Sequence, residues 1–111
     1  PREKFLVLFL DCSHRLIALE TMAEGTIDHA PVYAREVLRR AVELSASGLI
    51  LVHNHPSGSE TISKADVNVT TQIARAAAAL DIALIDHLVV AGQTVLGFVE
   101  RGLLPLSSGR C

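Results

Sequence analysis

Apolar residues occur in short runs separated by polar turns, and the spacing within each run predicts its secondary structure. Runs of strand length predict five β-strands, at residues 4–10, 16–22, 49–53, 82–90 and 95–100. The run at 4–10 is apolar almost throughout, so we expect that strand to be buried on both faces. Apolar residues at helical spacing predict two helices, at residues 32–46 and 63–80.

The order of these elements indicates the fold class. Strands and helices alternate too irregularly for repeated parallel units, and the polar turns at 11–15 and 92–93 each join two strands. We therefore expect an α/β layered fold with a mixed central β-sheet flanked by helices, in which 49–53 is the central strand. Residues 26–31 are predicted to be a connector.

The predicted helix at 32–46 has one apolar and one charged face. Its charged face includes Arg39 and Arg40, two adjacent arginines that could contact a partner. A solvated face is the simpler interpretation of such a pattern, and it is the one we adopt.

Composition and charge limit the class of protein. A chain of 111 residues is long enough for one domain and too short for two, and we assign 1–104 to that domain and 105–111 to a C-terminal tail. Half of the residues are apolar but only 4% are aromatic, so the core is expected to be aliphatic. A net charge of −2 gives no electrostatic reason to expect a nucleic-acid partner.

The first residue and the two cysteines indicate whether the chain is part of a longer protein and in which cellular compartment it is expected. Residue 1 is proline and not methionine, so we expect a piece of a longer protein that lacks its N-terminal region. No apolar run approaches the roughly 18–20 residues that cross a bilayer, and no signal peptide is recognisable. Cys12 and Cys111 are far apart and form no Cys-x-x-Cys motif, which favours a cytoplasmic protein.

The segment 51–66 carries the candidate chemistry. Residues i and i+2 of a strand project from the same face about 6.6 Å apart, so His53 and His55 can both face one ion. Pro56 and Gly58 begin a loop that lets the next helical turn bring Asp66 back as a third ligand. Three protein ligands leave one position of a tetrahedral zinc ion open, which is typical of a catalytic site and not of a structural one.

Two simpler interpretations of the same residues remain open. Ser63 and Asp66 have the spacing of a helix capping box, in which the serine hydroxyl caps a backbone N–H. The two histidines could equally be the solvated end of a strand. Neither interpretation explains why an apolar strand that ends in two histidines at metal spacing is followed by a carboxylate.

The other histidines are assigned no ligand role. His87 lies beside Asp86 in an apolar strand, where a buried imidazole needs a hydrogen-bond partner, and we expect a core histidine or one that supports the site indirectly. His14 in a turn and His29 in the connector are expected to be solvated.

The motif formed by His53, His55, Ser63 and Asp66 resembles that of the JAMM (MPN/JAB) metalloprotein superfamily. The sequence His-Asn-His-Pro-Ser-Gly at 53–58 resembles that of the RadC branch of this superfamily. Further segments that resemble RadC follow in the same order, at 5–11, 25–28, 35–37, 86–90 and 100–104. The resemblance covers nearly all of 3–104. Ala34 stands where the pattern leads us to expect proline, and the tail 105–111 matches no segment that we can name.

The resemblance implies a JAMM/MPN-like (cytidine-deaminase-like) fold and zinc-dependent hydrolysis of an amide bond. One Zn²⁺ per chain would be bound by His53, His55 and Asp66, and would lower the pKa of a water ligand and polarise the scissile carbonyl. The superfamily uses a glutamate just ahead of the first strand as general base, and Glu3 is the residue in that place. Ser63 would donate a hydrogen bond to the oxyanion.

Two other classes of function are considered beside the hydrolase. One is a zinc-binding or interaction domain without turnover, and the other is a nucleic-acid module, because RadC proteins carry a DNA-repair label. The weak basicity and low aromatic content argue against nucleic acid for this domain. A peptide or isopeptide-like substrate is expected, but no residue of the loop 56–62 identifies it.

Overall fold

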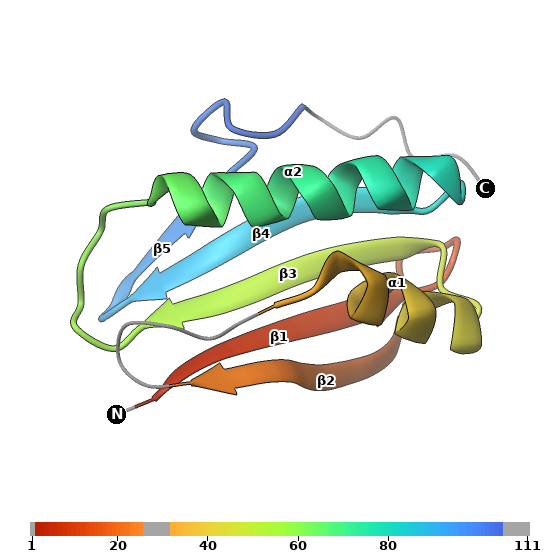
Figure 1. The fold of residues 1–111 in the computed structure, drawn as a ribbon, viewed down its shortest axis with the longest axis horizontal. Coiled ribbons are helices and arrows are strands. Elements are labelled where there is room, and N and C mark those ends of the chain that lie inside the picture. Colours follow the sequence, from red (N-terminus) through yellow and green to blue (C-terminus); the bar gives the residue numbers. More distant parts are fainter. Residues whose placement is uncertain (1, 26–31, 106–111) are drawn as a thin grey trace.

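A computed structural model describes residues 2–25 and 32–105, which form five strands and two helices (Figure 1). The strands are β1 Glu3–Leu10, β2 Leu16–Gly25, β3 Gly48–His55, β4 Ala83–Ala91 and β5 Thr94–Gly97. The helices are α1 Ala34–Glu43 and α2 Lys64–Ala79. Within this part of the chain, neither helix has the length and hydropathy needed to span a membrane. The connector at 26–31, with His29, and the segment 106–111 of the predicted tail lie outside the described residues.

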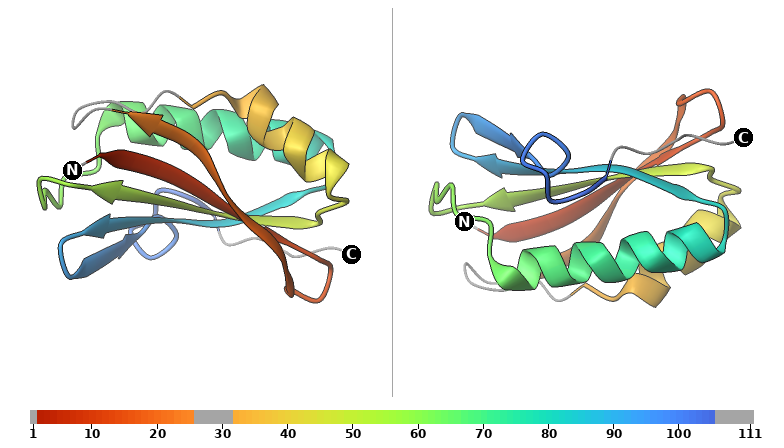
Figure 2. Two further views of the ribbon diagram at one scale, coloured as in Figure 1. Left: turned by 90° about the horizontal axis from the view of Figure 1, so that it is seen from below. Right: turned by 90° about the horizontal axis from the view of Figure 1, so that it is seen from above.

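The strands form one mixed sheet in the order β2-β1-β3-β4-β5. β3 and β4 are parallel, with α2 between them in the chain, whereas all other neighbouring strands are antiparallel. β3 is the central strand, as predicted. Figure 2 shows both helices on one face of the sheet and the segment after β5 on the opposite face. The predicted α/β fold with a mixed sheet is confirmed.

The placement of the helices corrects one expectation about β1. Phe5, Val7 and Phe9 are buried in the same core cluster as residues of α1 and α2, whereas Leu6 and Leu8, which alternate with them along the strand, are only partly buried. The strand therefore alternates in burial and is not buried on both faces. An apolar run alone could not show this, because both arrangements use the same residues.

Some element boundaries also differ from those predicted. α1 spans Ala34–Glu43 and not 32–46, because Tyr33 has an extended backbone and Ser45 has a left-handed φ of 54°. β3 continues to His55, two residues beyond the prediction. β5 ends at Gly97, and the chain turns over 98–100 where the prediction had continued the strand.

The adjacent arginines of α1, Arg39 and Arg40, are paired with carboxylates of the same chain. Arg40 donates two hydrogen bonds of 2.8 Å to the carboxylate of Glu20 on the edge strand β2. This pairing lowers the pKa of Glu20. Arg39 forms ion pairs with Glu36 and Glu43 on α1 itself. The ion pair between Arg40 and Glu20 thus links α1 to β2.

Candidate metal centre

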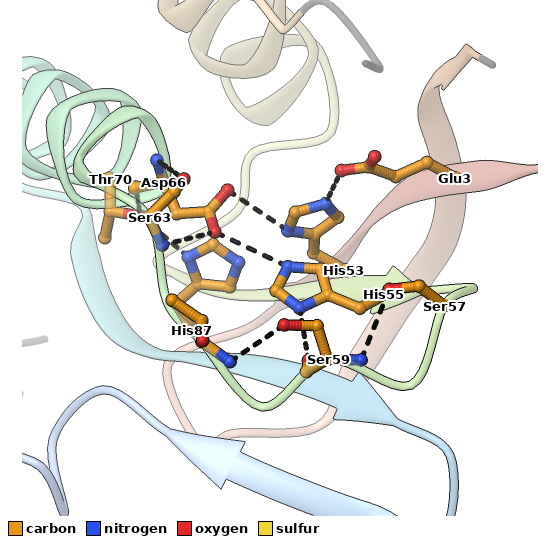
Figure 3. A network of polar contacts seen from close by, with 10 residues as sticks. Glu3, His53, His55, Ser57, Ser59, Ser63, Asp66, Thr70 and His87 are labelled. Carbon is orange, nitrogen blue, oxygen red and sulfur yellow. Dashed lines mark hydrogen bonds and ion pairs between the residues drawn. The ribbon is translucent and has the colours of Figure 1, made fainter. Parts of the chain in front are cut away.

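Three of the predicted site residues lie together where β3 ends and α2 begins. His53 and His55 are near the end of β3, and Asp66 is in the first turn of α2. His53 Nδ1 is 3.6 Å from Asp66 Oδ1, and His55 Nε2 is 3.5 Å from Asp66 Oδ2 (Figure 3). One nitrogen of each ring and one carboxylate oxygen all lie within 4.8 Å of one another, so this cluster could hold a metal ion.

Each histidine ring has a second nitrogen that does not face Asp66, and the hydrogen bond of that nitrogen identifies the tautomer of the ring. His55 Nδ1 donates to the backbone carbonyl of Ser59 at 2.8 Å, and His53 Nε2 donates to the carboxylate of Glu3. In the neutral form of each ring, His55 Nε2 and His53 Nδ1 are therefore the nitrogens with lone pairs, and both face the Asp66 carboxylate.

This arrangement of charges and lone pairs favours a cation. Two lone pairs beside a carboxylate repel it, and a positive ion between the three groups turns that repulsion into attraction. His53 Nδ1 is also buried without a hydrogen-bond partner among the described residues, and such a group is costly unless it binds something. The donor set of two imidazoles and one carboxylate therefore fits a divalent metal ion.

The capping-box interpretation is confirmed at the same time. The Asp66 N–H donates to Ser63 Oγ at 3.0 Å, and the Ser63 N–H donates to Asp66 Oδ2 at 3.1 Å. The cap orients the Asp66 carboxylate toward the two histidines. Ser63 Oγ accepts in this cap, and its hydroxyl proton has no acceptor among the described residues. That proton can be donated to a bound molecule.

Glu3 is held in the sheet and contacts the cluster. The sequence suggested a position just ahead of the first strand, but Glu3 is the first residue of β1 and pairs with Gly25 of β2. Its carboxylate lies on one side of the His53 ring, and Asp66 lies on the other (Figure 3). The side chains of Glu3, His55 and Asp66 are 13–14% exposed, so the site can be reached from solvent.

His87 lies beside the cluster but is not part of it. The single hydroxyl proton of Thr70 is donated to the carbonyl of Asp66 at 2.7 Å, so Thr70 Oγ1 accepts from His87 Nδ1 at 2.7 Å. The His87 ring stacks on Phe98, with ring centroids 4.3 Å apart. Burial, with a smaller effect from His53, lowers the pKa of His87 from 6.5 to about 3. A neutral, buried His87 beside the cluster agrees with the prediction of a core histidine that supports the site indirectly. His14 is exposed and lies in a turn, which also agrees with the prediction.

The low pKa of His87 predicts a loss of stability in acid. Unfolded His87 takes up a proton near pH 6.5, whereas folded His87 does not until about pH 3. The contribution of His87 to the free energy of unfolding is therefore full above pH 6.5, and it decreases by about 1.4 kcal/mol for each unit that the pH is lowered below that value. Urea unfolding of chelator-treated protein measures this effect. Between pH 6.5 and pH 5, the free energy of unfolding should decrease by about 2 kcal/mol less in His87→Gln than in wild type. The matched change His14→Gln, at an exposed position, should behave as wild type. An equal change of the free energy of unfolding with pH in all three proteins would contradict the assignment of His87 as a buried, neutral histidine.

Two polar residues of the site were missed from the sequence. Thr70 follows Asp66 by four residues on α2 and is buried, and its position on the apolar side of that helix was the available signal. Asn54 stands between the two histidines, and its side chain bonds to backbone groups fifty residues earlier in the chain. No spacing rule indicates such a contact.

Comparison with known proteins agrees with this geometry. Residues 1–103 match the family described as "RadC-like JAB domain". The chain belongs to this family. It is 58% identical over 104 residues to a UPF0758 protein of Rhodobacter capsulatus, 50% over 104 residues to one of Methylibium petroleiphilum, and 52% over 103 residues to one of Stenotrophomonas maltophilia.

These alignments cover nearly all of the chain but only part of each relative. They include 94%, 94% and 93% of this chain but 49%, 47% and 44% of the three relatives. The chain thus spans about half the length of the curated relatives it matches.

Proposed function

We propose that this RadC-like JAB domain is a zinc-dependent hydrolase that cleaves amide bonds in a peptide or isopeptide-like substrate. The observation that carries the proposal is the set of two imidazole lone pairs that face the Asp66 carboxylate, with a second carboxylate, Glu3, in contact with one of the rings.

His53 Nδ1, His55 Nε2 and the Asp66 carboxylate are the groups that would hold the ion. Two nitrogens and one oxygen are a donor set found in catalytic zinc sites, where three protein ligands leave a position for water or substrate. Bound zinc supplies Lewis acidity, which acidifies water and polarises a carbonyl group. The hydrogen bonds from His55 to Ser59 and from His53 to Glu3 keep the ring nitrogens in the required protonation state.

Glu3 and Ser63 are assigned the remaining roles. The Glu3 carboxylate, which lies across the His53 ring from Asp66, accepts a proton from the attacking water through one bridging water and passes it to the leaving nitrogen. The Ser63 hydroxyl, whose oxygen accepts in the helix cap, donates its proton to the oxygen of the cleaved carbonyl as negative charge develops there. Both side chains border the cluster that contains Asp66 (Figure 3).

Cleavage of a peptide library tests the proposal. Zinc-loaded protein is incubated with linear and lysine-branched peptides, and new termini are identified by mass spectrometry. We expect cleavage that stops when a chelator removes zinc and returns when zinc is restored. Stoichiometric zinc binding without cleavage of either peptide class would favour the alternative, a zinc-binding or interaction domain of a protein labelled as DNA repair.

Chelation is expected to leave the domain folded. The core consists of apolar residues that are not metal ligands, including fully buried Val7, Phe9, Val37 and Leu49, so metal binding is not expected to be the source of folding energy as it is in small zinc fingers. Circular dichroism with and without chelator should show the same helix signal, with a lower unfolding temperature in the metal-free form. Loss of the helix signal on chelation would indicate a structural site instead.

A further inference from the structure

The side chain of Asn54 bonds to the backbone on both sides of Glu3. Asn54 Oδ1 accepts a hydrogen bond from the Lys4 N–H at 2.6 Å, and Asn54 Nδ2 donates one to the Arg2 carbonyl at 3.1 Å. Asn54 also lies between His53 and His55 in the sequence. One side chain therefore connects the strand end that carries the histidines to the strand start that carries the second carboxylate.

The position of this contact in the sheet explains its importance. Backbone pairing between β1 and β3 begins at Phe5, opposite His53, and does not include residues 2–4. The amide of Asn54 has one acceptor and two donor hydrogens, so it can take the place of a peptide group where the ladder stops. On its other edge Glu3 pairs with Gly25 of β2. The start of β1 is thus held from both sides.

Glu3 is the first residue of β1, and the backbone pairing at Glu3 is with β2. Backbone pairing with β2 fixes one edge of Glu3, but its carboxylate must also stay beside the His53 ring, which belongs to β3. The Asn54 side chain contributes two hydrogen bonds between the β3 segment and the Arg2–Lys4 backbone. They link the backbone on both sides of Glu3 to the residue that follows His53.

We propose that Asn54 is a positioning residue that holds the Glu3 carboxylate at the metal centre. The proposal rests on the function assigned above, in which Glu3 is the general base. Asn54 acts through Glu3 and not through the metal, because its side chain bonds to the backbone beside Glu3 and not to the three proposed ligands. Removal of its side chain should therefore leave zinc bound and disturb only the carboxylate.

The first test needs no activity and uses NMR of the metal-free protein. Asn54→Ala should speed hydrogen exchange of the Lys4 amide at least tenfold and shift the His53 ring nitrogens in a long-range nitrogen–proton spectrum, because Glu3 no longer fixes the tautomer. Asn54→Asp keeps the acceptor and should preserve Lys4 protection. Asn68→Ala, at an exposed position of α2, is the matched control and should change neither signal. Unchanged Lys4 exchange and His53 shifts in Asn54→Ala overturn the inference.

The second test separates this inference from the proposed function. With the peptide library, Asn54→Ala should lower cleavage at least tenfold at unchanged zinc content, and should cause no further loss in a Glu3→Gln background, because both changes act through one group. Full activity of Glu3→Gln would overturn the role of Glu3 as base. A strong defect of Glu3→Gln, combined with full activity of Asn54→Ala or with an added loss in the double variant, would overturn the positioning role alone.

Discussion

Glu3→Gln is expected to keep zinc at the wild-type stoichiometry and to lower amide hydrolysis by about 10²- to 10⁴-fold, the usual contribution of a general base. Glutamine has nearly the same shape, and its Oε1 can still accept the hydrogen bond that His53 Nε2 donates to Glu3. The substitution therefore preserves the geometry of the site and removes only the ability to take a proton.

Two measurements are needed for this prediction, namely the zinc content of the purified variant and its rate of peptide cleavage. Glu100→Gln, at an exposed position outside the site, is the matched control and should have wild-type values of both. Loss of zinc from Glu3→Gln would show that Glu3 binds or supports the metal, and an unchanged cleavage rate would show that another group is the base.

Asp66→Asn is expected to abolish stoichiometric zinc binding and to leave the free energy of unfolding of the metal-free protein nearly unchanged. Asp66 has two roles, because its carboxylate faces the histidines and also accepts from the Ser63 N–H in the capping box. Asparagine keeps an oxygen that can accept in the cap, but it lacks the charge that a cation requires.

Ser63→Ala gives the opposite pattern. It removes the oxygen that accepts from the Asp66 N–H, and the loss of such a cap costs about 1 kcal/mol of stability. Zinc binding should persist, because Ser63 is not one of the three clustered donors. Zinc titration and urea unfolding of both variants separate the two roles. Full zinc binding by Asp66→Asn would mean that Asp66 serves only as part of the helix cap.

The elements of the fold were predictable because each leaves a local pattern in the sequence. Apolar runs marked all five strands, and helical spacing marked both helices, although ends of α1, β2, β3 and β5 were misplaced by two or three residues. The cluster of His53, His55 and Asp66 was predictable because β3 and α2 are neighbours in the chain, so that a short loop brings these residues together.

Contacts between distant parts of the chain could not be predicted in this way. The bond between Thr70 and His87 joins residues seventeen apart, and that between Lys4 and Asn54 joins residues fifty apart. Both depend on sheet register and helix packing, which a single sequence does not encode in its spacing. The ring nitrogens that face Asp66 are likewise set by contacts of His53 and His55 with Glu3 and Ser59.

Zinc content is the most direct test of the account, because every proposed role depends on a metal held by His53, His55 and Asp66. The wild-type protein and the variant His53→Ala/His55→Ala, with His14→Ala as an exposed control, are saturated with zinc, freed of loosely bound ions and examined by elemental analysis. We expect about one zinc per chain in wild type and in the control, and none in the double variant. Full occupancy of the double variant, or a wild type that holds no zinc, would contradict the account.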